Sequence, residues 1–383
     1  MQTAHPDPPA DAVPVADRDS RHAAIALGTT LPCDAVLYLL LPMYGEAFGI
    51  SLAEAGILLA ANRLVRIISY GWVARFYARY GDRRACTLAV AATALCALGH
   101  ATLTGFWALL PLRILWGLSY AALNLSSQVL ATSVPIGAAA RSGRAHAYIA
   151  MGPVLALPAA ALLSQLAGPR WIFVALVFVA LAGLIAARRL PGRPHPGVAT
   201  TRRTLTRPNA LDIWSFLEGF ALDGLFIIGL SVMSQAVLPG SAVVAAGILL
   251  ALRYGAEIIL SPLGGRMADR WGAEQLLVGF SLLTAGALIG FGTGWLWSCA
   301  AAIVVLRALQ LPLLPPIVAN RHPGPERVRA LTARSIWRDV GAGLGPVVAG
   351  LLLPVMPSPW LYGIPAVLLA AAAVACRRQT PRR

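Results

Sequence analysis

The chain is a succession of apolar runs about 20 residues long, separated by short turns. A helix needs about 20 apolar residues to cross the hydrocarbon core of a bilayer, where each unsatisfied backbone polar group costs several kcal/mol. The runs cover residues 24–44, 53–74, 86–105, 107–131, 146–167, 171–188, 212–237, 242–264, 275–294, 296–318, 331–353 and 358–376. They predict an all-α membrane protein with about twelve transmembrane helices.

Composition supports a membrane protein over a soluble one. Of the 383 residues, 58% are apolar and 12% are charged, whereas soluble domains carry roughly 25% charged residues. The net charge of +15 is compatible with nucleic-acid binding only if the basic residues share one soluble face. Here they alternate with apolar runs, so we expect a lipid bilayer as partner and no nucleic acid.

Arginines gather in every second turn. That side carries Arg75, Arg79, Arg83, Arg84, Arg141, Arg144, Arg188, Arg189, Arg266, Arg270, Arg321 and Arg327. The opposite turns hold Glu46, Glu54, Arg170 and few other charges. Basic turns remain in the cytoplasm, so this alternation predicts a multi-pass protein with both termini cytoplasmic, which we place in a bacterial inner membrane.

The chain divides into two similar halves. We expect a disordered cytoplasmic tail (1–22), an N-terminal six-helix bundle (23–189), a cytoplasmic linker (190–210), a C-terminal six-helix bundle (211–377) and a short cytoplasmic tail (378–383). Gly81 recurs as Gly272 after 191 residues, Arg113 as Arg307 after 194, and Gly152-Pro153 as Gly345-Pro346 after 193. A nearly constant offset is typical of a parallel repeat and predicts pseudo-symmetric bundles.

These residues resemble the major facilitator superfamily over essentially the whole chain. The turn "GGRMADRWGA" is similar to that family's cytoplasmic loop signature, whereas the first-half turn "ARFYARYGDRR" has Ala74 and Ala78 in place of its first Gly and its Asp. "RILWG" resembles the buried-arginine motif through Arg113 and Gly117. Gly152-Pro153 resembles the span-five motif of antiporters, and the resemblance therefore implies an exporter of drugs or metabolites that exchanges them for protons.

The same resemblance implies a set of gating residues, listed here: Arg79, Gly81, Gly152, Pro153, Gly265, Asp269, Arg270 and Gly272. Asp269 and Arg270 lie too near the cytoplasmic interface to bind a substrate at the midplane. We expect them to stabilise the outward-facing state through contacts across the two halves. The alternative is that they only cap a helix.

Charged side chains inside the spans are the strongest functional candidates, because each costs roughly 2.5 to 3.5 kcal/mol to insert. Burial favours a protonated carboxyl group and a nearby guanidinium favours a charged one, so a changing arginine contact can load or release a proton. We predict proton coupling by Asp34, with Arg113 as its partner and Asp223 second. The alternative is a permanent structural ion pair of Asp34 with Arg63 or Arg66.

Further polar residues inside the spans are predicted to bind substrate: Arg63, Arg66, Asn124, Gln128, Arg253, Glu257 and Arg307. Arg253 and Glu257 are spaced i,i+4 and could instead satisfy each other. Asn124 and Gln128 belong to a polar stripe on span four that could instead serve helix packing. Five arginines face four acids, once Glu218 is counted, which favours an anionic or zwitterionic substrate.

Motifs for catalysis are missing from the sequence: it has no GxSxG, HExxH or GxxxxGK[ST], so we expect no enzyme, and no cofactor or metal. The leading hypothesis is proton-coupled export of a small organic molecule, such as a drug, a metabolite or a siderophore-like chelator, by a monomer using alternating access. One alternative is proton-linked uptake of an organic anion. Another is a membrane sensor or assembly factor that transports nothing.

Overall fold

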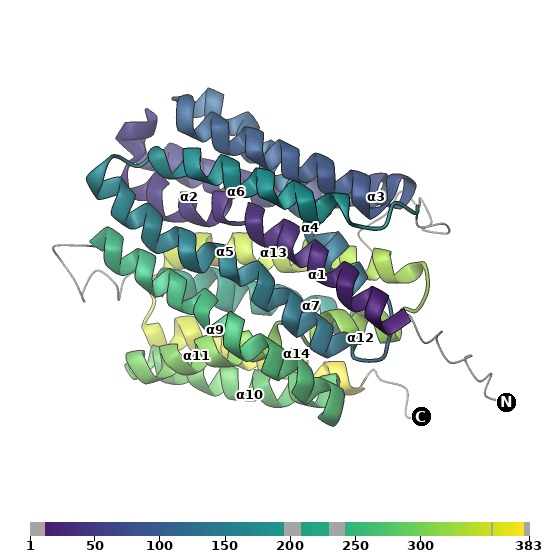
Figure 1. Cartoon of the computed structure of the whole chain (residues 1–383). Helices are drawn as coiled ribbons and strands as arrows, with labels where there is room; N and C mark the ends of the chain where they lie inside the picture. Colours follow the sequence, from purple (N-terminus) through teal and green to yellow (C-terminus); the bar gives the residue numbers. More distant parts are fainter. Residues whose placement is uncertain (1–11, 195–207, 230–241, 354, 379–383) are drawn as a thin grey trace.

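Helices make up the structure, a computed structural model that describes residues 12–194, 208–229, 242–353 and 355–378. The first half comprises α1 (Ala12–Thr30), α2 (Pro32–Met43), the 3-10 turn η1 (Gly45–Phe48), α3 (Leu52–Thr102), α4 (Phe106–Ala131), α5 (Ala138–Leu166) and α6 (Trp171–Arg188). The second comprises α7 (Ala210–Glu218), η2 (Gly219–Leu225), α9 (Ala242–Trp271), α10 (Ala273–Gly292), α11 (Leu296–Gln310), α12 (Leu314–Arg321), α13 (Glu326–Leu352) and α14 (Ser358–Arg378). Within these residues there is no strand (Figure 1).

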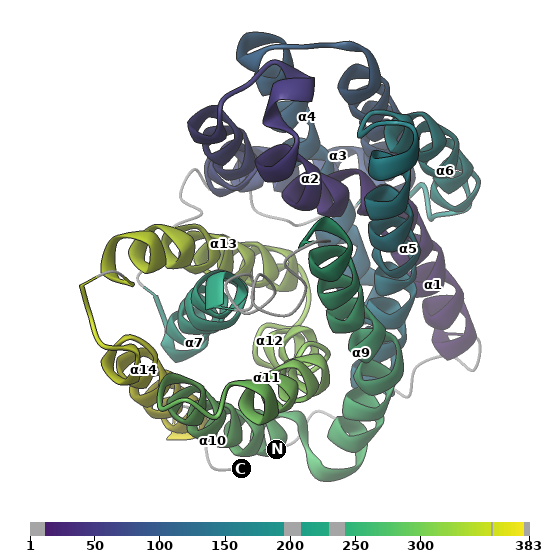
Figure 2. The ribbon, with the colours of Figure 1, turned by 90° about the vertical axis from the view of Figure 1, so that its left-hand side faces the viewer.

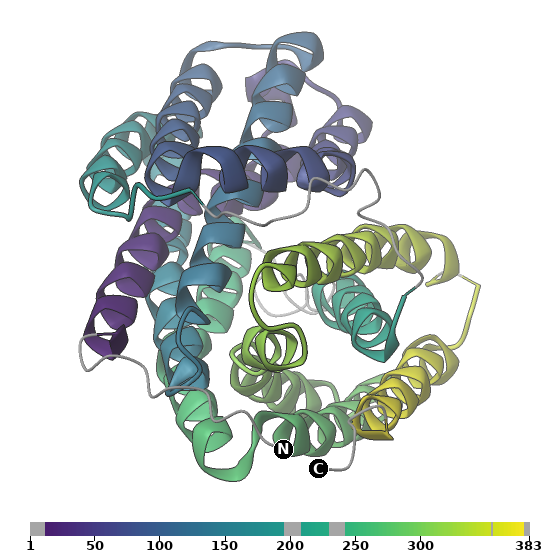
Figure 3. The same ribbon diagram turned by 90° about the vertical axis from the view of Figure 1, so that its right-hand side faces the viewer.

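The two halves form separate bundles that meet along two seams, and the expected fold class is confirmed. Figure 2 shows α1 to α6 in one group and α7 to α14 in the other, with α5 packed along α9. The second seam, between α3 and α13, is seen from the opposite end in Figure 3. Both chain ends leave the same end of the molecule (Figure 1).

Nine helices of the described residues are long and apolar enough to cross a membrane. One of them, α3, has 51 residues and holds two of the predicted spans. Another helix, α13, holds span eleven but falls outside those nine because Arg334, Arg338 and Asp339 lie within it. Each predicted span therefore lies mainly on helix where the chain is described, with a turn at 311–313 that divides span ten into α11 and α12.

The spans that carry Asp34 and Asp223 are both irregular. Span one is divided at Leu31 into α1 and α2, because Pro32 has no N–H to continue the helix ladder. Asp34 lies in the first turn of α2, where the helix dipole favours negative charge. In span seven α7 passes into the π-helical turn η2, which contains Asp223; such turns are frequent at functional sites.

The two basic turns bend at single glycines. Gly81 interrupts α3 with φ 74°, and Gly272 separates α9 from α10 with φ 86°. A positive φ is unfavourable for residues with a side chain, which explains why glycine stands at both positions. The prediction of a loop between spans two and three is therefore wrong in its length, because helix continues up to Gly81 on both sides.

The prediction of a disordered tail through residue 22 is also wrong, because α1 begins at Ala12. This first part of α1 is held by tertiary contacts: Ala16, Asp19 and Ser20 are buried, and Asp17 accepts a hydrogen bond from Arg144 of α5 at 2.9 Å. Residues 1–11, linker residues 195–207 and residues 379–383 lie outside the described part of the chain. Asn209 of the linker forms a capping box with Asp212 at the start of α7.

Candidate functional site

The carboxylate of Asp34 is paired with Arg113 in the first half. Arg113 Nη1 donates to Asp34 Oδ1 at 2.6 Å, and its Nε donates to the carbonyl of Leu58 at 3.0 Å. Asn62 Nδ2 of α3 also donates to Asp34 Oδ1, at 3.0 Å. Asp34 thus has one guanidinium and one neutral amide as partners, and the expected contact with Arg113 is present.

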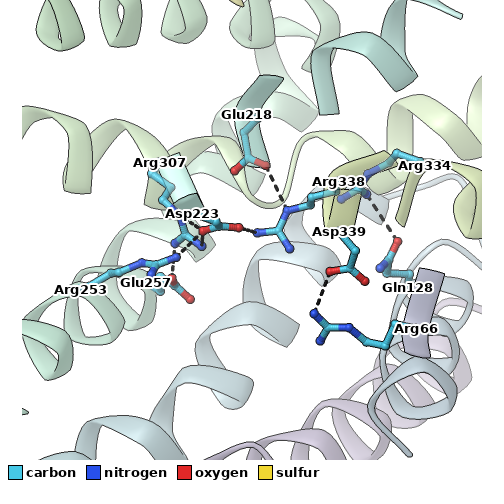
Figure 4. A network of polar contacts seen from close by, with 10 residues as sticks. All are labelled: Arg66, Gln128, Glu218, Asp223, Arg253, Glu257, Arg307, Arg334, Arg338 and Asp339. Carbon is cyan, nitrogen blue, oxygen red and sulfur yellow. Dashed lines mark hydrogen bonds and ion pairs between the residues drawn. The ribbon is translucent and has the colours of Figure 1, made fainter. Parts of the chain in front are cut away.

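Asp223 has a different environment in the second half (Figure 4). Three guanidinium groups donate to its carboxylate: those of Arg253 from α9, Arg307 from α11 and Arg338 from α13. Arg307 Nη2 lies 2.9 Å from Asp223 Oδ1. Asp223 thus has three cationic partners, whereas Asp34 has one.

Two glutamates complete the second-half cluster. Arg307 Nη1 donates to Glu257, and Arg338 Nε donates to Glu218 Oε2 at 3.0 Å (Figure 4). The alternative in which Arg253 and Glu257 satisfy each other along α9 is therefore wrong. Arg253 pairs with Asp223 of η2, and Glu257 pairs with Arg307 of α11.

The two clusters are copies of one arrangement. Asp34 and Asp223 both pair with the arginine of the repeat, Arg113 or Arg307. Asn62 and Arg253 are 191 residues apart, the offset of Gly81 and Gly272, and each donates to the aspartate of its own half. The repeat therefore conserves the geometry of the site and changes one neutral donor into a cation.

One ion pair of the described residues joins the two halves inside the spans. Arg66 Nη2 of α3 donates to Asp339 Oδ1 of α13 at 2.9 Å (Figure 4). The same guanidinium lies 4.4 Å from the ring centre of Tyr120. Both side chains are buried, and Arg66 Nε and Asp339 Oδ2 have no hydrogen-bond partner among the described residues. The structure does not place Arg66 or Arg63 against Asp34, so that alternative is wrong.

Three charged residues of α13 were missed by the sequence analysis: Arg334, Arg338 and Asp339. All three lie within the predicted span 331–353, so the signal that selected the other candidates was present. Arg334 Nη1 lies 3.4 Å from Gln128 Oε1 across the α4–α13 boundary. Gln128, a predicted substrate residue, therefore faces the other half, whereas Asn124 contacts Tyr70 within its own half at 3.5 Å.

Arg63, like Arg334, forms no ion pair with a carboxylate of the described residues. Its Nε lies 3.4 Å from the hydroxyl of Tyr38, and no carboxylate of the described residues lies within ion-pair distance of it. With the α13 residues included, seven arginines and five carboxylates occupy the spans away from their ends. The surplus of two positive charges is larger than the sequence analysis counted.

Asp269 connects the halves near the end where both termini lie. Its two carboxylate oxygens accept hydrogen bonds from the backbone N–H groups of Ala139 and Ala140, at 3.3 and 3.0 Å. These are among the free donors at the start of α5. Asp269 thus caps α5 and connects the two halves with the same two hydrogen bonds. Helix capping and contact across the halves, which were stated as alternatives, are both present.

Glycines allow this bridge to close. A side chain at Gly265 of α9 would lie 2.3 Å from the carbonyl oxygen of Ala139, and one at Gly143 of α5 would lie 2.3 Å from that of Ser261. The two helices can therefore approach closely at both positions. Arg270 and Arg79 are exposed, and Arg79 lies over the ring of Tyr80 in its own helix.

Gly152 and Pro153 lie where α5 crosses the break in span one. Pro32 leaves the carbonyl of Gly28 without its helical donor, and a side chain at Gly152 would lie 2.0 Å from that oxygen. Gly345 makes the same close approach to Gly224 in the second half. The span-five motif therefore positions the helix that carries Asp34.

Two similar helical bundles, with ionisable groups paired inside each and across their interface, are an architecture typical of membrane transport proteins. The family model of the Major Facilitator Superfamily matches residues 23–238 and 219–383. The chain belongs to the major facilitator superfamily.

Solved structures share this fold. The human organic anion transporter MFSD10 (TETRAN) is 16% identical, with a TM-score of 0.75 over 97% of this chain and 100% of that one. The proton:xylose symporter XylE, bound to 6-bromo-6-deoxy-D-glucose, is 12% identical, with a TM-score of 0.74 over 97% of this chain and 96% of that one. At these identities the similarity concerns the fold alone.

Proposed function

We propose that this chain is a proton-coupled secondary transporter that exports a small organic molecule across a bacterial inner membrane by alternating access. Both termini lie in the cytoplasm in this proposal, in keeping with the arginine-rich turns. Asp34 carries the proton and Arg113 controls when it is released. The chain works as a monomer with protons and the substrate as its ligands.

The observation that carries this proposal is the single guanidinium on Asp34. A carboxylate with one arginine partner can exchange it for a proton when the arginine moves, whereas Asp223 must lose three partners to do the same. Asp34 also lies at the helix break beside Pro32, next to the Gly152 crossing. A change in how α1 and α5 cross would therefore alter the Asp34–Arg113 contact directly.

The contacts between halves support alternating access. The hydrogen bonds of Asp269 and the Arg66–Asp339 pair both join the bundles. Both must break for the halves to separate at the end where the termini lie. With the termini in the cytoplasm, the described arrangement corresponds to a closed cytoplasmic side. The export direction rests on the resemblance of Gly152-Pro153 to the antiporter motif.

Proton flux in proteoliposomes tests the proposal. Purified protein is reconstituted with a trapped pH-sensitive dye, and a panel of organic cations, anions and zwitterions is added under an imposed pH gradient. Panel members that are exported drive proton movement, and Asp34→Asn abolishes that movement while substrate exchange without a gradient persists. Glu46→Gln, an exposed carboxylate outside the spans, is the matched control and retains wild-type flux.

Unchanged proton flux in Asp34→Asn contradicts the assignment of Asp34. Loss of flux together with loss of exchange also contradicts it, because Asp34 would then be needed for binding rather than for coupling.

Proton-linked uptake of an organic anion is the second candidate, favoured by the surplus of two arginines over carboxylates in the spans. Arg63, whose contacts include no carboxylate among the described residues, and the partly exposed Arg253 and Arg338 would then hold the anion. Inside-out vesicles with an acidic lumen distinguish the two, since they accumulate substrate only if the protein is an exporter.

A further inference from the structure

A polar pocket lies between α1 and α5, at the end of the molecule where both termini lie (Figure 1). Its volume is about 350 Å³, within the range of small-ligand sites. The residues used below all line it: Asp17, Arg18, Arg21, Arg141, Arg144 and Tyr148. None of them belongs to the proposed proton or substrate site.

The lining has four arginines and one carboxylate, so the pocket is positively charged. Arg144 Nη2 donates to Asp17 Oδ1 at 2.9 Å, and the same oxygen lies 3.6 Å from Arg141 Nη1. Asp17 is thus shared by the two arginines of α5 and offsets about one of their charges. On α1, Arg18 pairs with its neighbour Asp19, and Arg21 has no ion-pair partner among the described residues, so the pocket keeps a surplus of positive charge.

Arg141 has a structural role in this pocket. Its side chain is 1% exposed, and it donates to the backbone carbonyls of Ala131, the last residue of α4, and of Val134 and Ile136 in the turn that follows. The guanidinium therefore fixes the floor of the pocket. Arg18 and Arg21 are exposed, and Arg18 contacts only its neighbour Asp19, at 3.1 Å, among the described ion pairs.

The pocket lies at the start of the first predicted membrane span. Val15, one residue from Pro14 of the lining, is 43% exposed on the same helix, and the predicted first span begins at residue 24, directly after this segment. Arginine-lined pockets between transmembrane helices on the cytoplasmic side suit the phosphate groups of anionic lipids. Guanidinium groups bind phosphate oxygens in pairs, which adds geometric selectivity to the charge.

We propose that this pocket binds the phosphate headgroup of an anionic phospholipid from the cytoplasmic leaflet, with Arg18 and Arg21 as the principal ligands. The proposal uses the orientation proposed above, in which the termini are cytoplasmic, but it does not depend on the substrate or on proton coupling.

Binding at this pocket has a consequence for the seam. Arg141 and Arg144 lie in the first turns of α5, as do Ala139 and Ala140, whose backbone N–H groups donate to Asp269 of α9. A headgroup that ties α1 to this part of α5 stabilises the platform on which Asp269 docks. Anionic lipid therefore favours the closed cytoplasmic side.

Native mass spectrometry of the full chain in detergent tests the proposal, with phosphatidylglycerol, phosphatidylcholine and inorganic phosphate as separate probes. The wild type binds phosphatidylglycerol at least about tenfold more tightly than phosphatidylcholine, and Arg18→Gln/Arg21→Gln removes that preference. Arg18→Lys/Arg21→Lys retains most of it, because the charges remain, and so shows that the preference follows positive charge at these two positions.

Arg75→Gln/Arg266→Gln is the matched control. Both arginines are exposed, and each donates to a carbonyl of its own helix, at Gly71 and Pro262 respectively. This variant loses the same charge and keeps the lipid preference. Equal loss in the control overturns the proposal, because binding would then follow net charge alone. Unchanged phosphatidylglycerol binding in Arg18→Gln/Arg21→Gln overturns it as well. If inorganic phosphate competes with the lipid at equal concentration, the ligand is a soluble phosphate and the lipid proposal is overturned.

Discussion

The two halves of the molecule place an aspartate against the same repeated arginine, yet they surround it differently. In the first half Asp34 has Arg113 and the neutral amide of Asn62. In the second half Asp223 has Arg307, Arg253 and Arg338. The repeat thus keeps one contact while the number of cations around the aspartate differs, and in the proposed mechanism the first half holds the movable proton and the second half a fixed ionic cluster.

The seams between the halves differ in a related way. Asp269 of α9 accepts from free N–H groups because α5 begins at Ala138, immediately before Ala139. The corresponding positions on α13, 193 residues later, are 332 and 333, well inside a helix that begins at Glu326. Their N–H groups are already used by the helix, so a carboxylate at Ala78 would have nothing to accept. The Arg66–Asp339 pair joins that seam instead.

The largest expected effect is on stability in the second half. Asp223→Asn leaves three arginines with only Glu218 and Glu257, and breaking a buried ionic cluster costs about 3 to 5 kcal/mol. We expect a much lower thermal unfolding midpoint for this variant than for Asp34→Asn, measured by intrinsic fluorescence in detergent. Equal midpoints for the two variants would remove the distinction between a fixed and a movable site.

The α3–α13 seam should open when its ion pair is removed. Asp339→Asn removes the carboxylate that Arg66 contacts across the seam. This destabilises the closed state and not the open one, so the open state gains about 2 kcal/mol, or about thirtyfold in population. Spin labels at the exposed positions 75 and 326 report the distance across this end. No increase in the long-distance population would show that the pair does not hold the seam.

Removal of the neutral donor tests why Asp34 is responsive. Asn62→Leu keeps the side-chain size but removes one of the two side chains that donate to Asp34. One hydrogen bond is worth about 1 kcal/mol, so we expect the rate of proton-driven transport at a fixed pH gradient to fall about fivefold. Gln165→Leu, at an exposed amide near the far end of α5, is the control. An unchanged rate, or an equal fall in the control, would contradict the role of Asn62.

The smallest effect concerns the α5–α9 seam. Asp269→Ala removes the cap on α5 and favours opening by about 1 kcal/mol, roughly fivefold in the spin-label distance populations. Adding Ala78→Asp to this variant does not restore closure, because α13 offers no free N–H groups there. Restored closure in the double variant would show that the two seams are equivalent after all.

The fold was accessible from the sequence because span length, arginine distribution and repeat offset are local or periodic properties. The Asp34–Arg113 contact was also predictable, since both residues are isolated charges that need a partner in lipid. Partner choice within a crowded cluster was not: Arg253 lies one turn from Glu257, yet it pairs with Asp223 from another helix. Such choices depend on how helices pack, which periodicity does not report.

Two errors have more particular causes. The start of α1 has little apolar pattern of its own, and its order comes from contacts with α5 such as Asp17–Arg144. The charges of α13 were visible inside span eleven, but the pairing of Asp339 with Arg66 required knowledge that α13 faces α3. Helix neighbours are tertiary information.

Infrared difference spectroscopy between acidic and alkaline pH tests the central claim most directly, because it records the carbonyl band of protonated carboxyl groups. In the wild type a protonated-carboxyl band appears on acidification, and the account predicts that Asp34→Asn removes it while Asp223→Asn leaves it in place. A band that survives in Asp34→Asn and disappears in Asp223→Asn would contradict the assignment of the movable proton to the first half.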